Sequence, residues 1–150
     1  MAPIHRFIAA LSLGALVACS GRHVAVGPAP ASPEATVGQF LAAVNAADLG
    51  RMAQLFGDER GPSTVTIRNG TEREQRVAIM QRLLWCDSSR VVGTEAVPGT
   101  HRRQLRVELI RGDRRIPVPF TVAPQRAGGW LVAVIDLNPV LPPTGPRPNP

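Results

Sequence analysis

The sequence predicts an α+β domain in which three N-terminal helices pack on a curved antiparallel sheet of about four to five strands. In the first half of the chain, apolar residues recur with the three-to-four-residue spacing of helices. After Asp87 they alternate with polar residues, which is the spacing of strands. The expected strands are joined by short turns, and short turns join antiparallel neighbours. Helices followed by such a meander belong to the α+β class.

Two helices are expected between Glu34 and Phe56. Ser32 and Pro33 provide an N-cap followed by proline at the first helical position. The apolar face of the first helix consists of Val37, Phe40, Leu41 and Val44. Asp48 is the expected N-cap of the second, short helix. The apolar residues of that helix are Leu49, Met52, Leu55 and Phe56.

The next segment, STVTIRNG (63–70), is expected to form a short strand that ends in an Asn-Gly turn. Thr71–Glu74 matches a capping box, and a capping box marks the start of a third helix. The apolar face of this helix consists of Val77, Met80, Leu83 and Leu84. Its other side carries charges such as Arg82, which we expect to face solvent.

Four strands are expected at about Arg90–Val97, His101–Arg111, Arg114–Ala123 and Gly129–Leu137. Pro-Gly and Gly-Asp turns and a longer Gly-containing loop separate them. In the last strand, residues of both parities are mostly apolar. Such a strand is expected at the centre of the sheet, covered on both faces.

The chain of 150 residues fits one domain between two terminal segments. We expect a signal peptide over 1–18, a lipidated cysteine and a tether over 19–33, the folded domain over 34–138, and a disordered tail over 139–150. The tether is rich in Ala, Gly and Pro, and the tail is rich in Pro, which removes backbone donors.

The formal net charge is +6, and all 17 basic residues are arginine. A nucleic-acid-binding chain normally also uses lysine, which is a compact charge for phosphate. We therefore expect no nucleic-acid partner and only a modest attraction to anionic surfaces.

The N-terminus has a positive charge followed by an apolar run from Phe7 to Ala18 and then Cys19. A helix over this run would be about 18 Å long, whereas the bilayer core is about 30 Å thick, so it fits a signal peptide better than a membrane span. Leu16-Val17-Ala18-Cys19 resembles the lipobox of bacterial lipoproteins. The resemblance implies cleavage between Ala18 and Cys19 and acyl chains on Cys19 that bind the membrane.

Ser20, rather than Asp, follows the cysteine, which in enteric lipoproteins implies sorting to the outer membrane, facing the periplasm. The alternative is an ordinary secretory signal in which Cys19 occurs by chance. If Cys19 is acylated, Cys86 is the only free thiol, and we expect it to be a small buried apolar residue.

The first helix ends in an A-x-N-x-x-D turn (43–48), and the last strand reads GGWLVAVIDL (128–137). In these features, residues 32–138 resemble the nuclear-transport-factor-2-like superfamily. The resemblance implies a cone, in which a bent sheet wraps round the long helix, often with an apolar pocket. The pocket-lining candidates are Phe40, Val44, Met80, Trp130 and Val132.

Ketosteroid-isomerase-like and polyketide-cyclase-like enzymes of this superfamily place an Asp or His base in the cone, often with a Tyr. This chain has no Tyr, and only Asp136 and His101 remain as candidates for a base, because Asp48 and Asp87 are better explained as a cap and a turn residue. His and Cys are too few for a metal cluster, and no cofactor motif is present.

We therefore expect a non-catalytic domain that binds a small apolar ligand or an envelope partner. One alternative is an enzyme that uses Asp136 or His101. Another is a hairpin, 101–115, that binds an anionic surface. Its arginines are Arg102, Arg103, Arg106, Arg111, Arg114 and Arg115. The competing interpretation is a solvated hairpin whose arginines pair with Glu108 and Asp113.

Overall fold

The structure is a computed structural model and describes residues 27–142. The expected signal peptide, the Ala18–Cys19 cleavage site and most of the tail lie outside the described residues. The elements are α1 (Pro33–Asn45), α2 (Leu49–Leu55), β1 (Gly57–Asp58), β2 (Gly61–Pro62), α3 (Ser63–Thr66), α4 (Gly70–Leu84), β3 (Ser88–Ala96), β4 (Arg103–Arg111), β5 (Arg114–Pro124), β6 (Trp130–Ile135) and the 3₁₀ turn η1 (Asn138–Val140). They confirm the α+β class.

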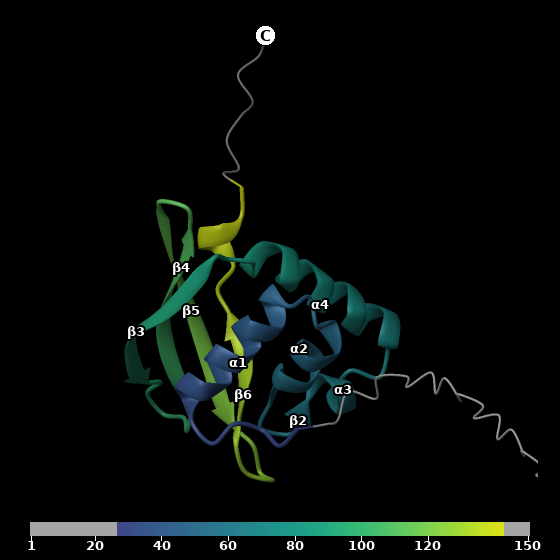
Figure 1. Ribbon diagram of the computed structural model, residues 1–150. Coiled ribbons are helices and arrows are strands. Elements are labelled where there is room, and N and C mark those ends of the chain that lie inside the picture. The colour runs from purple at the N-terminus through teal and green to yellow at the C-terminus, as the bar shows by residue number, and fades with distance from the viewer. Residues whose placement is uncertain (1–26, 143–150) are drawn as a thin grey trace, which may run out of the picture.

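The main sheet is an antiparallel meander in the order β3-β4-β5-β6, and β1 and β2 form a separate two-stranded ribbon. The helices lie on one face of the main sheet, and α1 runs along that face (Figure 1). The alternation expected from the sequence is present, because Leu105, Val107 and Leu109 of β4 point into the core and are buried. At the centre, the ring of Phe40 meets that of Phe120 edge-on, with 6.4 Å between centroids.

The first two helices begin where the sequence predicts. Ser32 caps α1 by accepting a hydrogen bond from the Ala35 amide at 3.1 Å. Asp48 caps α2 by accepting from the Arg51 amide at 2.9 Å. Each cap satisfies a backbone donor that has no partner within its helix.

The prediction of a strand over STVTIRNG is wrong, because this segment contains the one-turn helix α3. Ser63 donates its hydroxyl to the Ala53 carbonyl at 2.7 Å, and Thr66 donates to the Pro62 carbonyl at 3.3 Å. Hydroxyls that bind nearby backbone in this way compete with a strand ladder. The N-cap of α4 is Asn69, which accepts from the Glu72 amide at 3.2 Å, and not Thr71.

The prediction that the last strand is central is also wrong, because β6 lies at the edge of the sheet beside β5. Part of this edge is protected by an isolated parallel bridge between Phe56 and Val132. Leu131 is buried, and a side chain at Gly57 would collide with it, so the ribbon that begins at β1 covers the start of β6. The set of apolar side chains to which Leu131 belongs is thus covered by the β1–β2 ribbon at the start of β6, although the strand is not central.

The packed domain extends beyond the expected range of 34–138. The Trp130 amide donates to the Pro30 carbonyl at 2.9 Å, so residues before α1 lie against the start of β6. Gly129 has a φ of +79°, and a Cβ there would come within 2.6 Å of the Ala29 side chain. At the other end, Val140 of η1 packs on the core.

Candidate functional site

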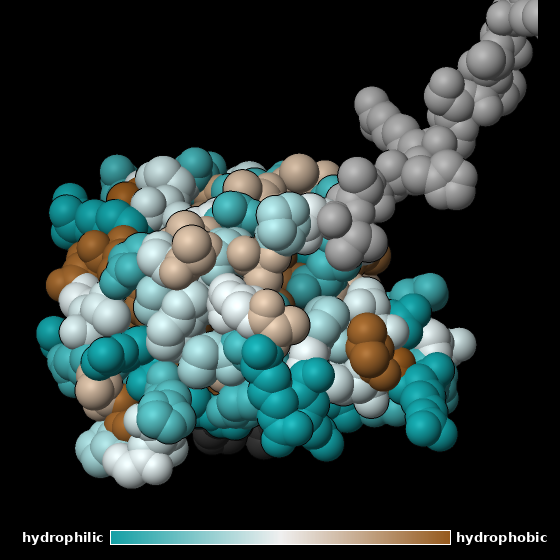
Figure 2. Space-filling view, turned by 90° about the horizontal axis from the view of Figure 1, so that it is seen from below, coloured by the Kyte–Doolittle hydropathy of each residue, from teal (hydrophilic) through white to brown (hydrophobic). Residues whose placement is uncertain are grey.

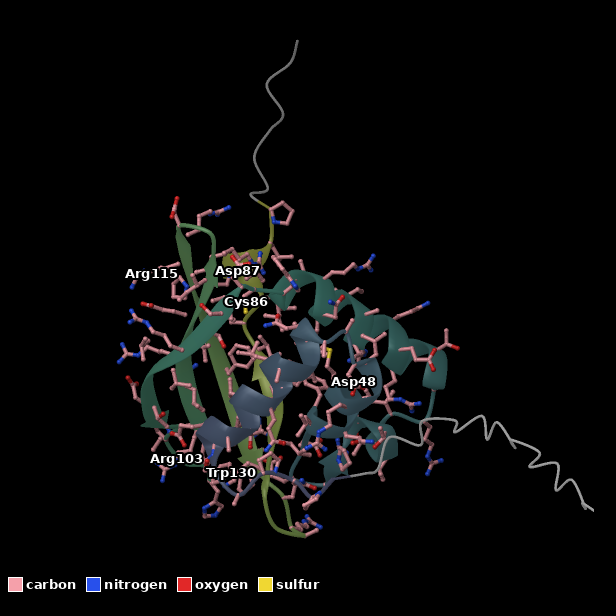
Figure 3. All side chains as sticks on the ribbon, in the orientation of Figure 1. Asp48, Cys86, Asp87, Arg103, Arg115 and Trp130 are labelled. Carbon is pink, nitrogen blue, oxygen red and sulfur yellow. The ribbon has the colours of Figure 1, made fainter. Side chains whose placement is uncertain are left out.

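Side chains fill the space where the sequence suggests a pocket. Phe40 and Val44 of α1 and Val132 of β6 are fully buried in the core. Met80 is 7% exposed and reaches the surface in a groove beside α4. Trp130 is half-buried at the end of the sheet where Arg103 also lies (Figure 3). Of the five pocket candidates, only Met80 and Trp130 therefore border space that a ligand can enter.

The structure places the two candidate bases apart. His101 is exposed in the turn between β3 and β4 and borders a shallow hollow with Trp130. Asp136 is exposed after β6 and accepts a hydrogen bond from the Asn138 amide at 3.0 Å. This bond makes Asp136 a turn residue at the start of η1.

An open apolar groove of about 320 Å³ lies between α4 and β6. Ile79 of α4 is 48% exposed and Val134 of β6 is 50% exposed. The groove is lined by Phe56, Arg76, Ile79, Met80, Ala133, Val134, Ile135 and Leu137. Large apolar side chains gathered at an open surface are typical of a binding site.

Among the residues that the structure describes, the backbone of β6 has no strand partner on its outer side at Ile135, beside this groove. The Asp136 amide donates to the Pro119 carbonyl of β5 at 3.0 Å. Because successive residues of a strand direct their N–H and C=O groups to opposite sides, those of Ile135 point away from β5, toward the groove. The Phe56–Val132 bridge protects the edge only nearer the start of β6. An apolar groove and an unpaired strand edge thus lie side by side.

A second groove, of about 510 Å³, lies on the other side of α4, against α2 and α3. Its lining is Leu49, Gly50, Ala53, Thr64, Arg73, Glu74, Gln75, Val77 and Ala78. Arg73 donates to the Ile67 carbonyl at 3.1 Å, which ties the start of α4 to the segment after α3.

Most arginines of the 101–115 hairpin have partners within the fold. Arg102 makes a bidentate pair with Glu59, at 2.6 and 2.9 Å, and this arginine holds the pKa of Glu59 below its ordinary value. Arg106 lies 3.3 Å from Glu95, and Arg115 lies 3.9 Å from Glu108.

Arg111 donates to the Trp85 carbonyl at 2.7 Å and to the Leu83 carbonyl, both at the end of α4. Arg103 and Arg114 form no ion pair with any residue that the structure describes. Arg103 is at the start of β4, whereas Arg114 faces Arg111 at the turn between β4 and β5, so the two charges lie at opposite ends of the hairpin. Figure 3 shows Arg103 and Arg115, the neighbour of Arg114, at these two ends of the sheet.

Within residues 27–142, no three His, Cys, Asp or Glu side chains are grouped so that they could hold a metal ion. Over the same range, no helix combines the length and the apolar character that crossing a membrane requires. No protein-family model matches the chain, and no curated protein matches it significantly.

The sequence did not single out the groove beside β6. Ile79 lies off the buried face of α4, and Val134 and Leu137 belong to the strand expected to be covered on both faces. The apolar residues on both parities of that strand were the available indication. Apolar residues on both sides of a strand occur when the strand is buried in the sheet and also when it borders an open groove. Hydrophobicity alone does not distinguish these two cases.

Proposed function

We propose that this chain is a lipid-anchored protein of the bacterial cell envelope whose domain binds an extended apolar segment of another envelope protein and carries out no catalysis. The anchor on Cys19 and the nuclear-transport-factor-2-like assignment rest on the sequence resemblances. The binding activity rests on one observation, the apolar groove of Ile79, Met80 and Val134 beside the unpaired edge at Ile135.

A peptide fits this site better than a small hydrocarbon ligand does. The interior is filled, so an apolar ligand would remain partly in water in an open groove. An extended peptide can add to β6 and pair with the N–H and C=O groups of Ile135. Every second side chain of such a strand would point into the groove, toward Ile79 and Met80. The backbone supplies affinity, and the groove selects apolar residues at alternate positions.

The test uses short peptides in which apolar and polar residues alternate. Titration calorimetry with the protein should show binding, and Ile79→Asp and Val134→Asp should each weaken it by about tenfold or more, because each removes roughly 1.5–3 kcal/mol of apolar burial. Arg82→Gln, an exposed change on α4 outside the groove lining, is the matched control and should bind as the parent does.

Peptides with N-methylated backbone amides separate strand addition from simple apolar contact. They should bind markedly more weakly, because methylation removes the donors that a β6 partner needs. Equal binding of methylated peptides, or binding unaffected by Ile79→Asp and Val134→Asp, would contradict this assignment.

A further inference from the structure

The described chain begins at the end of the molecule formed by α2, α3 and the start of α4 (Figure 1). Arg51 of α2 donates to the Gly27 carbonyl at 3.4 Å. Thr64 of α3 borders both the hollow that contains Gly27 and the groove between α2 and α4. Any anchor attached upstream of Gly27 therefore holds this end of the domain nearest to its point of attachment.

This end presents an exposed apolar residue among arginines. Val65 of α3 is 70% exposed, more than any other large apolar residue that the structure describes. Arg68 and Arg73 follow it in the chain, and neither forms an ion pair within residues 27–142. Figure 2 looks at this end and shows a small hydrophobic patch beside hydrophilic residues on the α3 side. We call Val65, Arg68 and Arg73 the α3 face.

The charges of the α3 face suit an anionic surface. The Arg73 guanidinium donates to the Ile67 carbonyl, and that of Arg51 donates to Gly27, Gln39 and Gln54. Within residues 27–142, neither arginine forms an ion pair with a carboxylate. Glu74 is the acidic residue of the same groove, while Glu72 is paired with Arg76 at 2.6 Å. The positive charge is therefore in excess around Val65.

We infer that the α3 face docks on an anionic lipid bilayer when the chain is anchored. This inference rests on the lipid anchor of the proposed function. Eight peptide units link Cys19 to Gly27, and they span at most about 28 Å. A tether of this length keeps the α3 face at a high effective concentration near the lipid, so a small contact area is sufficient. Val65 enters the interface, and the arginines bind anionic headgroups.

Docking in this orientation leaves the proposed peptide site accessible. In Figure 1, α3 and η1 lie at opposite ends of the molecule, and α4 runs from one toward the other. Leu137, at the η1 end, lines the groove beside β6. The bilayer would thus bind one end of α4 while the groove opens farther from the membrane.

The test is hydrogen exchange of the full acylated protein in vesicles of phosphatidylethanolamine and phosphatidylglycerol, compared with vesicles of phosphatidylcholine alone. Flotation of the protein with the vesicles reports anchoring separately. Backbone amides over 64–73 should exchange more slowly in the anionic vesicles, by a factor of up to about five. Val65→Asp and Arg68→Gln should each remove much of this protection. Val65→Asp removes the apolar side chain that enters the interface, and one arginine at an anionic surface contributes roughly a fivefold change in the docking equilibrium.

Val92→Asp and Arg114→Gln alter exposed residues of β3 and of the β4–β5 hairpin, and they are the matched controls that should keep the protection. Salt at about 0.5 M, where charges act over only about 4 Å, should weaken it. Equal exchange over 64–73 in both vesicle types, with flotation intact, would overturn docking and leave the anchor and the peptide site standing. Failure to float would overturn both the anchor and the docking.

Discussion

At the residue scale, Asn45 joins the end of α1 to the turn after α4. Its side-chain oxygen accepts from the Cys86 amide at 3.2 Å, and its amide nitrogen lies 3.9 Å from the Cys86 sulfur. Cys86 is buried in the core, as expected for a small apolar residue. Burial raises the pKa of the Cys86 thiol, although the contact with Asn45 acts in the opposite direction.

This shift predicts a loss of stability at alkaline pH. A thiol whose pKa is higher in the folded state than in the unfolded state stabilises the fold fully below the unfolded value, about 8.5, and this contribution is lost as the pH rises above it. Cys86→Ala should lower the free energy of unfolding at pH 7 by about 1 kcal/mol. In urea unfolding, the difference between parent and variant should shrink as the pH increases above 8.5. A constant difference would contradict this explanation.

At the element scale, the start of α4 shows where local sequence rules are insufficient. Both Thr71 and Asn69 are good N-cap residues, and each has Glu three positions later. The helix begins at Gly70 because Asn69 accepts from the Glu72 amide. Arg73 also contacts the Ile67 carbonyl, and this contact fixes how the chain enters the helix.

Asn69→Ala should lower the free energy of unfolding by about 1 kcal/mol, the usual effect of losing an N-cap. Thr71→Ala is the matched control and should cost much less, because Thr71 lies within the helix and is exposed. Urea unfolding of both variants provides the measurement. A larger effect at Thr71 than at Asn69 would place the helix start at the position that the sequence pattern favoured.

The ranges of β4 and β5 were predicted as well as the starts of α1 and α2. β4 and β5 match their expected ranges closely, since alternation of buried and exposed residues sets strand register over a long segment. The position of β6 in the sheet depends on which segments meet its two sides. The Phe56–Val132 bridge joins residues that are far apart in the sequence, and no local pattern reports such a contact.

At the scale of the whole molecule, the expected attachment point and the proposed binding groove are separated by the fold. The described chain begins near α3, and the groove beside β6 ends at Leu137, next to η1. With this separation, the proposed anchor on Cys19 would orient the domain as well as retain it at the membrane.

Cys19→Ser tests the anchor itself. The variant should lose acyl labelling and accumulate as an uncut precursor, because the lipid acceptor is a thiol and cleavage follows lipidation in the family that the lipobox resembles. Metabolic labelling with a fatty acid and the mobility of the protein on a gel provide the measurements. Normal processing of the variant would indicate ordinary secretion.

The sequence by itself determined the α+β class, the ranges of β4 and β5, the caps at Ser32 and Asp48 and the burial of Cys86, because each depends on spacing or on a few neighbouring residues. Only the tertiary structure decided that the interior is filled, that β6 is an edge strand and that the hairpin arginines are largely paired. These features depend on contacts between distant segments, such as Arg102 with Glu59 and Phe40 with Phe120. The groove of Ile79 and Val134 is of the same kind, since it exists only where α4 and β6 are brought together.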